Sequence, residues 1–476
     1  MRKTKIVCTL GPATDDFDTL AKVCSSGMNV ARFNFSHGDY EQQGKRIELF
    51  KSVREKLNLY IPMMLDTKGP EIRIGTFKDK KVTLIDGNEF TLAHDECDGT
   101  NEKVYVNYPL LSNDVTIGTT ILINDGIIAL EVTEIIDKDV KCKVIHGGDL
   151  TDRKSVNIPG LKLNLPLLTK KDEDDIVFGI KNGFDIIAVS FVRSPLDIIA
   201  IKGILKQHNA SHIKIIAKIE NHEGVENFDK ILDVVDGIMV ARGDLGVEIP
   251  IEQVPLLQKE FVQKCNKAGK IVIIATQMLE SMITNPRPTR AEVSDIANAI
   301  FEGATAIMLS GETAAGKYPA ECVKTMHTIA ESIENSTDYW KNFRERNYNY
   351  LINNRADLIV GHSLCELAMQ VDAKAIFSLS SHGNTPIAIS GFHPGCPIYA
   401  IISDICTASQ LNLVWNVTPI LVDYSDSPEA MIQQGIEKAK EYGYIAIGDK
   451  IIIGSSDTHD KMGFAQNKTI GGIYVV

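Results

Sequence analysis

Short apolar runs recur through the first two thirds of the chain, and most are followed by an amphipathic stretch of helix length. Continuous runs such as Ile271–Ala275 are typical of parallel strands buried on both faces. The runs are centred on Ile6, Val30, Met63, Ile187, Ile215, Ile238, Ile273 and Ile307. Six of the seven intervals between these centres have the length of one strand–loop–helix–loop unit. Eight units predict an α/β fold with a closed (β/α)8 barrel, a doubly wound open sheet being the alternative.

The interval from Met63 to Ile187 is far too long for one helix, so we expect an inserted domain after the third strand. Within it, short segments alternate between apolar and polar residues: Val82–Ile85, Val104–Val106, Thr120–Ile123 and Ile128–Val132. Turn dipeptides such as Asp86-Gly87 and Asp125-Gly126 separate them. This pattern predicts a small antiparallel β domain, a small β-barrel, placed to close over the mouth of the larger barrel as a lid.

A third region follows a helical stretch that ends near Glu345. Strand-like runs alternate there with helical patterns, at Ala375–Leu379, Pro397–Ile401, Thr418–Val422 and Lys450–Ile453. They predict an open α/β domain. The expected domains are therefore residues 1–70 and 167–345 for the barrel, 71–166 for the β lid and 346–476 for the C-terminal domain.

Composition restricts the class of protein. The 476 residues are 44% hydrophobic and 24% charged, as in ordinary folded proteins. The net charge of −12 argues against a nucleic-acid partner, and no apolar run is long enough to cross a membrane. The apolar stretch after the basic start is too short for a signal peptide, and the nine cysteines form no Cys-x-x-Cys pair. A cytoplasmic protein is expected.

Polar residues gather where the predicted strands end, which is where barrels of this type place their active sites. The segments that follow strands two, three, five, six, seven and eight are Arg32–Gly38, Leu65–Arg73, Lys218–Asn221, Ala241–Gly246, Thr276–Met278 and Ser310–Thr313. Five of the six carry formal charge beside an apolar run. Because packing alone gives no reason to place charge there, the strand ends predict a functional site.

Lys218 and Glu220 are two residues apart on the fifth strand, so their side chains share a face. Glu220 and Asp244 offer hard oxygen ligands from neighbouring strands, which suits Mg²⁺ or Mn²⁺. A simple Lys218–Glu220 ion pair is the alternative. The backbone N–H groups of Gly243 and Asp244 are candidates to bind a substrate carboxylate.

Arg32 and Arg73 are suited to forked contacts with phosphate oxygens, although either alone would be interpreted as part of an ordinary ion pair. Four further residues at strands two and three offer an oxygen-rich set for a monovalent cation. They are Asn34, Ser36, Asp66 and Thr67. Turn capping is the alternative role for Asn34 and Ser36.

Six segments resemble the signature blocks of the pyruvate kinase family in their order and spacing: Arg32–Gly38, Leu65–Arg73, Lys218–Asn221, Ala241–Glu248, Thr276–Met282 and Pro288–Asp295. The resemblance covers essentially the whole chain. It implies transfer of a phosphoryl group from phosphoenolpyruvate to ADP, giving pyruvate and ATP, the last step of glycolysis. It also implies Mg²⁺ (or Mn²⁺) and K⁺ as cofactors and a homotetramer as the assembly.

The resemblance also implies roles for individual residues. Lys218, Arg32, Arg73 and Thr276 would be catalytic, with Gly243 and Asp244 joining Arg32, Lys218 and Thr276 in substrate binding. Glu220 and Asp244 would hold the divalent ion, and Asn34, Ser36, Asp66 and Thr67 the K⁺ ion. Asn34, His37, Arg73 and Lys154 would contact the nucleotide. Thr276 would position the proton that converts enolpyruvate to pyruvate, because a free threonine is too weak an acid to donate it alone.

The loop Ser380–Thr385 has donors suited to a phosphorylated effector, and the resemblance implies an effector site there. The candidate effector residues are Ser380, Ser381, Gly383, Asn384 and Thr385. Neither this loop nor Ser455–Asp460 contains Lys or Arg, so a plain packing loop is the alternative. Thr289–Glu292 predicts a helix-capping box. Two other functions stay open at this point, a different metal-dependent enolate enzyme and a non-catalytic metabolite sensor.

Overall fold

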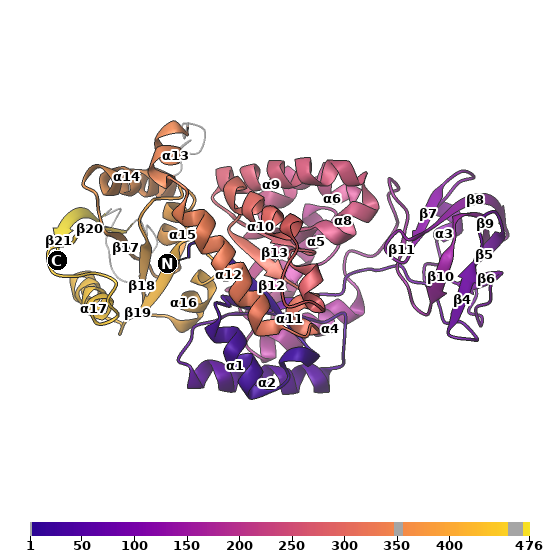
Figure 1. Cartoon of the computed structure of the whole chain (residues 1–476), viewed down its shortest axis with the longest axis horizontal. Coiled ribbons are helices and arrows are strands. Elements are labelled where there is room, and N and C mark those ends of the chain that lie inside the picture. The colour runs from indigo at the N-terminus through magenta and orange to yellow at the C-terminus, as the bar shows by residue number, and fades with distance from the viewer. Residues whose placement is uncertain (1, 347–355, 456–469) are drawn as a thin grey trace.

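The chain forms three units in a row (Figure 1). The computed structural model describes residues 2–346, 356–455 and 470–476. The barrel lies in the middle, the β domain at one end and the C-terminal α/β domain at the other, with the N-terminus at the boundary between the barrel and the C-terminal domain. No helix among the described residues is long and apolar enough to cross a membrane.

Eight parallel strands close the central barrel in the order β1-β16-β15-β14-β13-β12-β3-β2, which confirms the barrel over the open sheet. They are β1 (Lys5–Leu10), β2 (Val30–Asn34), β3 (Met63–Asp66), β12 (Ile186–Val189), β13 (Lys214–Ile219), β14 (Gly237–Ala241), β15 (Ile271–Ala275) and β16 (Ala306–Leu309). Each predicted strand centre lies in one of them.

Helices surround this barrel. They are α1 (Phe17–Ser25), α2 (Tyr40–Lys56), α4 (Lys170–Lys181), α5 (Pro195–Gln207), α6 (His222–Glu226), α7 (Phe228–Val234), α8 (Arg242–Glu248), α9 (Val254–Ala268), α10 (Arg290–Glu302), α11 (Gly311–Ala314) and α12 (Pro319–Asn335). The next helix, α13 (Tyr339–Glu345), packs against the C-terminal domain, where Tyr339 contacts Trp415 and Phe343 contacts His362. Three short 3₁₀ helices are η1 (Pro12–Thr14), η2 (Ile251–Gln253) and η3 (Glu280–Ile283). The predicted capping box is confirmed at the start of α10, where Thr289 and Glu292 exchange side-chain-to-backbone hydrogen bonds.

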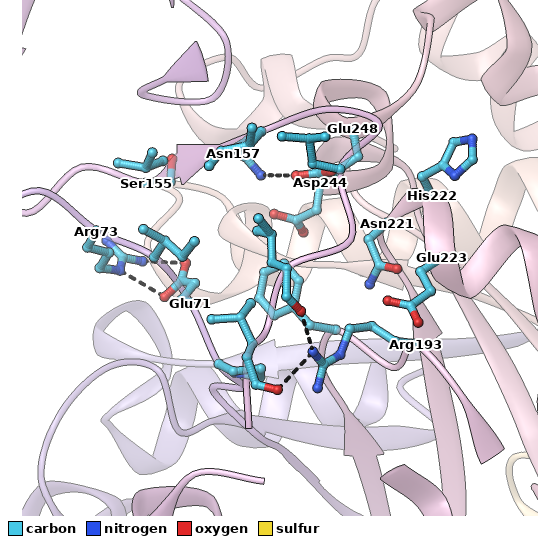
Figure 2. Close-up of a pocket in the computed structure, with 18 of the residues that line it drawn as sticks. Glu71, Arg73, Ser155, Asn157, Arg193, Asn221, His222, Glu223, Asp244 and Glu248 are labelled. Atoms are coloured by element: carbon cyan, nitrogen blue, oxygen red, sulfur yellow. Dashed lines mark hydrogen bonds and ion pairs between the residues drawn. The ribbon is translucent and has the colours of Figure 1, made fainter. Parts of the chain in front are cut away.

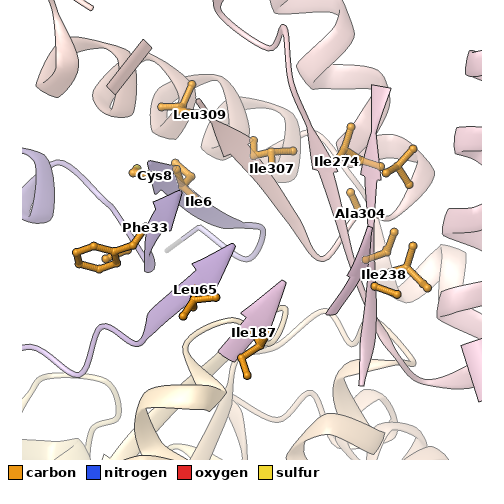
Figure 3. Packing of buried hydrophobic residues seen from close by; sticks show 14 of the residues in the cluster. Ile6, Cys8, Phe33, Leu65, Ile187, Ile238, Ile274, Ala304, Ile307 and Leu309 are labelled. Carbon is orange, nitrogen blue, oxygen red and sulfur yellow. The ribbon is translucent and has the colours of Figure 1, made fainter. Parts of the chain in front are cut away.

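Alternate residues of each barrel strand belong to two different cores. Ile6, Cys8 and Phe33 are among those that pack with the surrounding helices (Figure 3). Val7 and Val30 belong to a second cluster, which continues into the core of the C-terminal domain. Burial on both faces explains why the strands are apolar throughout. It also means that polar residues at the last interior positions converge on the barrel axis.

The inserted β domain consists of two hydrogen-bonded sheets. The six-stranded sheet contains β11 (Val156–Asn157), β7 (Thr120–Ile123), β8 (Ile128–Ile136), β9 (Asp139–His146), β5 (Glu89–Ala93) and β6 (Lys103–Tyr105), in that order. The two-stranded sheet pairs β10 (Gly148–Thr151) with β4 (Lys81–Leu84), and α3 (Leu111–Asp114) is the one short helix among the domain's described residues. The expectation of a purely antiparallel barrel needs correction, because β5 and β6 pair in parallel and the strands form two sheets.

Two segments of chain connect the β domain to the barrel, one after β3 and one before α4 (Figure 1). Gly69 and Gly160, one in each segment, have φ values of 73° and 77°, a conformation that favours glycine. The predicted boundaries at residues 70 and 166 fall in these segments and, with the boundary at 345, stay predictions.

The C-terminal domain has a five-stranded sheet in the order β19-β18-β17-β20-β21. Its strands are β17 (Ala375–Leu379), β18 (Ile398–Ile402), β19 (Val417–Leu421), β20 (Lys450–Ser455) and β21 (Ile470–Val475). Its helices are α14 (Ala356–Gln370), α15 (Asn384–Ser390), α16 (Ile405–Leu411) and α17 (Pro428–Glu441). All four predicted strands are present, whereas the antiparallel β21 was not predicted.

Asp185 links the base of the barrel to the C-terminal domain. Its carboxylate accepts a hydrogen bond from the backbone N–H of Met63 at 2.8 Å and contacts the Cys406 thiol on α16 at 3.7 Å. Burial raises the pKa of Asp185 to about 6, although Arg54 and His212 favour the charged form. Because the pKa of Asp185 is higher in the folded than in the unfolded state, ionisation of its carboxyl lowers the free energy of unfolding as the pH rises. The loss is at most about 3 kcal/mol.

We therefore expect Asp185→Asn to raise the thermal unfolding midpoint at pH 8, and to raise it less at pH 5, where the wild-type carboxyl holds more of its proton in the folded state. Differential scanning fluorimetry at both pH values measures the effect. The exposed Asp233→Asn is the control. An equal gain at both pH values would contradict the assignment.

Candidate active site

A buried carboxylate, Asp66, lies between two cations in the barrel interior, at the carboxyl-terminal ends of the strands. Arg32 Nε donates to Asp66 Oδ2 at 2.6 Å, and Lys218 Nζ to Asp66 Oδ1 at 3.0 Å. These side chains come from the ends of β2, β3 and β13, and all three are at least nine-tenths buried. Burial by itself would raise the pKa of Asp66, but Arg32 and Lys218 outweigh it and hold the pKa below its usual value. The carboxylate is therefore ionised.

Lys218 has three side-chain partners. Besides Asp66, its ammonium contacts Glu220 Oε1 at 3.0 Å and donates to Ser190 Oγ at 2.7 Å. Burial alone would lower the pKa of Lys218, yet the carboxylates of Asp66 and Glu220 raise it above the ordinary value. The ion pair with Glu220, considered above as an alternative, thus exists as one contact of a larger charged cluster.

Glu220 and Asp244 form an acidic pair beside this cluster. Glu220 accepts the backbone N–H of Phe191 at 2.6 Å. Burial, and then the charge of Asp244, raise the pKa of Glu220 despite the opposing effect of Lys218. The pKa of Asp244 is also raised, chiefly by desolvation. Glu220 is buried and Asp244 is exposed to solvent, and the charge of Asp244 helps to raise the pKa of Glu220, so the pair is a donor set that a hard cation stabilises.

No group of three or more His, Cys, Asp or Glu side chains with metal-ligand geometry occurs within the described ranges. A pair of carboxylates nevertheless fits Mg²⁺ or Mn²⁺. These ions usually keep several water ligands and take only one or two carboxylates from the protein.

The predicted monovalent-cation residues lie at the adjoining ends of β2 and β3, where Asn34 pairs with Asp66 in register. Asn34 Oδ1 accepts the Ser36 N–H at 3.0 Å, so the turn-capping alternative describes a real contact. The Thr67 carbonyl accepts the hydroxyl of Ser190 at 2.6 Å. Each of these neutral oxygens keeps a lone pair beyond its hydrogen bond, which allows a second role in holding a cation.

Thr276 follows β15 with φ +68°, an unusual conformation for a β-branched residue. Its hydroxyl accepts the Gly243 N–H at 2.9 Å and lies 2.6 Å from the Ala275 carbonyl, to which it donates. Arg242 donates to the Thr276 carbonyl at 2.6 Å and to Asp295 at 2.7 Å. Backbone strain held by such a network is common at functional sites.

Asp244 faces a cleft between the barrel and the β domain (Figure 2). The cleft has a volume of about 200 Å³, and Arg73 and Lys154 line its β-domain wall. Arg73 is bound by both oxygens of Glu71, at 2.7 and 2.8 Å. Asn157 donates to Glu248 at 2.7 Å and so joins the β domain to α8.

The structure brings some predicted residues together and separates others. Arg32, Lys218, Glu220 and the monovalent-cation residues lie beside the cleft without lining it. The predicted nucleotide residues divide into two groups, because Arg73 and Lys154 line the cleft whereas Asn34 and His37 do not.

In the predicted effector loop, Ser380 and Thr385 are buried, Gly383 has φ +79°, and its N–H donates to Ser380 Oγ at 3.1 Å. Asn384 is exposed, and Ser381 is only partly buried. Most of the companion stretch Ser455–Asp460 lies outside the described residues.

Thr9 and Ser190 are two members of the charged cluster that were not predicted. Thr9 Oγ1 accepts from Arg32 at 2.7 Å, and Ser190 Oγ contacts both Lys218 and Asp66. They lie at the ends of β1 and β12, the two strand ends that were not considered above. Both face the barrel interior, so period-two counting from Val7 and Ala188 would have found them.

Comparisons with known proteins agree with this geometry. The family model for the pyruvate kinase barrel domain matches residues 1–323, and the model for the pyruvate kinase alpha/beta domain matches residues 359–466. The chain belongs to the pyruvate kinase family.

Curated relatives give the same result. The pyruvate kinase of Bacillus licheniformis is 46% identical over 478 residues, covering 100% of this chain and 81% of that protein. The Staphylococcus epidermidis and Geobacillus stearothermophilus pyruvate kinases are 48% and 46% identical, each covering 95% of this chain and 77% of the relative. The predicted family and activity, a phosphotransferase of glycolysis, are confirmed at this level.

The Asn157–Glu248 bond generates a prediction about the β domain. Because this hydrogen bond joins the β domain to the barrel, Asn157→Leu destabilises the state in which the two are in contact by about 1 kcal/mol. That loss shifts the population about fivefold toward open forms. We expect a larger radius of gyration by small-angle X-ray scattering and a higher KM for ADP. Asn113→Leu, exposed on α3, is the control; an unchanged radius would contradict the role.

Proposed function

We propose that the cluster around Asp66, together with the adjoining cleft, transfers the phosphoryl group of phosphoenolpyruvate to ADP. The observation that carries this proposal is the buried chain Arg32–Asp66–Lys218–Glu220 at the barrel mouth. Transfer of a phosphoryl group needs positive charge held in place before the reaction, because the transition state carries its charge on the phosphoryl oxygens.

Lys218 is the central cation. Its pKa stays raised, so it is charged throughout the physiological range, and its three partners fix the position of the ammonium. ADP attacks phosphorus in line with the departing enol oxygen while Lys218, Arg32 and Arg73 stabilise the phosphoryl charge. Arg73 enters from the β domain, so its contribution depends on how that domain sits over the mouth.

Glu220 and Asp244 are the proposed ligands of Mg²⁺ or Mn²⁺, and Asn34, Ser36, Asp66 and Thr67 those of K⁺. When bound, these ions supply positive charge beside the substrate oxygens. The N–H groups of Gly243 and Asp244 are the proposed contacts of the substrate carboxylate, for which the Gly243 N–H would exchange its bond to the Thr276 hydroxyl. Asn34, His37, Arg73 and Lys154 stay proposals as nucleotide contacts, better supported for Arg73 and Lys154, which line the cleft.

Thr276 is proposed to position the proton that converts enolpyruvate to pyruvate. Its hydroxyl hydrogen is directed to the Ala275 carbonyl and its oxygen accepts from Gly243, an arrangement that supports positioning instead of direct donation. The β domain excludes water that would otherwise hydrolyse the phosphoryl donor.

The cellular setting and assembly are part of the same proposal. All nine cysteines are free, and seven of them are buried, which supports a reducing, cytoplasmic environment. A homotetramer is supported by β21, a sheet edge that pairs with no described strand on its outer side and exposes Ile473, Tyr474 and Val475.

Lys218→Met tests the central cation. We expect kcat to fall by at least about 10³-fold, because a fixed charge that stabilises the transition state is lost. A coupled assay for pyruvate with and without ADP and K⁺ measures the rate, and circular dichroism checks the fold. The exposed Lys206→Met is the control. Near-normal turnover of Lys218→Met would disprove its role, and absence of ADP-dependent pyruvate formation by the wild type would disprove the function.

Asp244→Asn tests the divalent site without relying on turnover. Electron paramagnetic resonance of free Mn²⁺ should show binding weakened by at least about 10-fold, since one of two charged ligands is lost. Glu248→Gln, a carboxylate of the same helix held by Asn157, should keep most of the affinity. Equal losses in the two variants would contradict the assignment.

A further inference from the structure

A second cavity lies at the opposite end of the barrel, between the barrel and the C-terminal domain. Its volume is about 160 Å³. The barrel contributes Lys214, Val235, Asp236 and Ala268–Ile271, and the C-terminal domain contributes His382, Asn384, Ile387, Thr407, Gln410, Leu411 and Val414. The walls therefore combine an apolar surface with a charged and polar rim.

A smaller hollow of about 20 Å³, roughly the room that one water molecule needs, adjoins this cavity. The two share Lys270, Ile271, Ile387 and Val414 among their wall residues. His393 is one of the residues that line only the smaller hollow. The shared wall makes the hollow an extension of the cavity.

His393 is an unusual residue to find in such a place. It is 5% exposed, its backbone has φ +50°, and its ring lies 4.3 Å from that of Trp415. Burial lowers the pKa of His393 to about 3, so the ring is neutral and offers one donor and one acceptor at the wall of the hollow.

The rim supplies the positive charge that the predicted effector loop lacks in its own sequence. His382 and Asn384 of that loop reach the cavity, and the barrel places Lys214 and Lys270 on the same rim. Lys214 Nζ lies 3.4 Å from Asp236 Oδ1, a partly exposed pair. Lys270 Nζ donates to the Asp233 carbonyl at 3.1 Å. The lining residues include two lysines and one aspartate, while Asp233, outside the lining, also interacts with Lys270.

The position in the fold connects this cavity to the active site. Lys214 begins β13, Asp236 directly precedes β14, and Ile271 begins β15. The opposite ends of the same strands lead to Lys218 and Glu220, to Asp244 and to Thr276. A ligand that shifts the start of these strands against the C-terminal domain therefore acts on elements that hold catalytic groups.

We propose that this interdomain cavity is a regulatory site for a small organic anion with an apolar body. Its carboxylate or phosphate group binds at the lysine rim, and its body packs against Ile271, Ile387, Leu411 and Val414. A cavity of about 150 Å³ accommodates a benzene ring, which sets the size of the body. The binding claim stands on the cavity alone, whereas the regulatory claim rests on the proposed function.

Calorimetry on the full chain tests binding with benzoate, phenyl phosphate and the neutral benzamide. We expect millimolar affinity for at least one anion and about 10-fold weaker binding of benzamide, since the charge-assisted contact is lost. Preference for benzoate or phenyl phosphate identifies the head group. The proposal would be overturned if neither anion bound saturably, or if benzamide bound as tightly as the anions.

Variants locate the site. Lys214→Met removes a cation from the rim, and Asn384→Trp fills the exposed edge of the cavity. Each variant should weaken anion binding by about 10-fold or more. Lys206→Met should not. Lys218→Met should also leave the affinity unchanged; loss of binding in that variant would place the anion at the active site and refute the interdomain assignment.

The regulatory claim is measured separately. Reciprocal coupling requires that saturating phosphoenolpyruvate change the affinity for the bound anion, and that the anion change phosphoenolpyruvate affinity by the same factor. We expect a change of at least about 3-fold, which Lys214→Met abolishes. Anion binding without any such change would refute regulation while leaving the binding site in place. Failure of the proposed function would instead show as absent turnover with anion binding intact.

Discussion

The active site depends on one carboxylate shared by two cations. Without Asp66, Arg32 and Lys218 would be buried like charges facing each other, and each would lose its main compensation for desolvation. Removing one partner of such a buried pair typically destabilises a protein by about 3–5 kcal/mol. The same residue pairs in register with Asn34 on β2, the strand that carries Arg32, and with Ala188 on β12, which in turn pairs with β13, the strand that carries Lys218.

The cluster also explains how an acidic protein handles anionic substrates. Arg32 and Lys218 face three carboxylates, those of Asp66, Glu220 and Asp244, which leaves one uncompensated negative charge at the mouth of the barrel. Desolvation is the main cause of the raised pKa values of Glu220 and Asp244, and the charge of Asp244 adds to it for Glu220. A divalent ion bound by the proposed ligands would reverse the sign of the uncompensated charge and make the mouth of the barrel a positive site. The net charge of −12 is therefore irrelevant to binding, because the field is set by a few buried groups.

Periodicity in the sequence was sufficient to predict the eight barrel strands, because strands buried on both faces are apolar at every position. It was also sufficient to predict that Arg32, Lys218 and Glu220 lie close together, since strand ends in a barrel share one edge. It missed Thr9 and Ser190, which are uncharged and look like ordinary strand residues. It missed β21 because Ile470–Val475 is a strand through its pairing with β20, which its own sequence pattern does not indicate. The presence of Arg73 in the cleft and the absence of Asn34 from it depend on how two domains sit together, which no local pattern encodes.

The β domain is attached to the barrel at two places, after β3 and before α4. A body held by a single tether can tumble in any direction, whereas two attachment points define a line and leave mainly rotation about that line. Gly69 and Gly160 lie on the two connecting segments and have backbone conformations that impose little strain on glycine. Two attachment points therefore favour rotation about the line that joins them, and Arg73, close in sequence to one of them, would move less in such a rotation than charges at the far end of the domain.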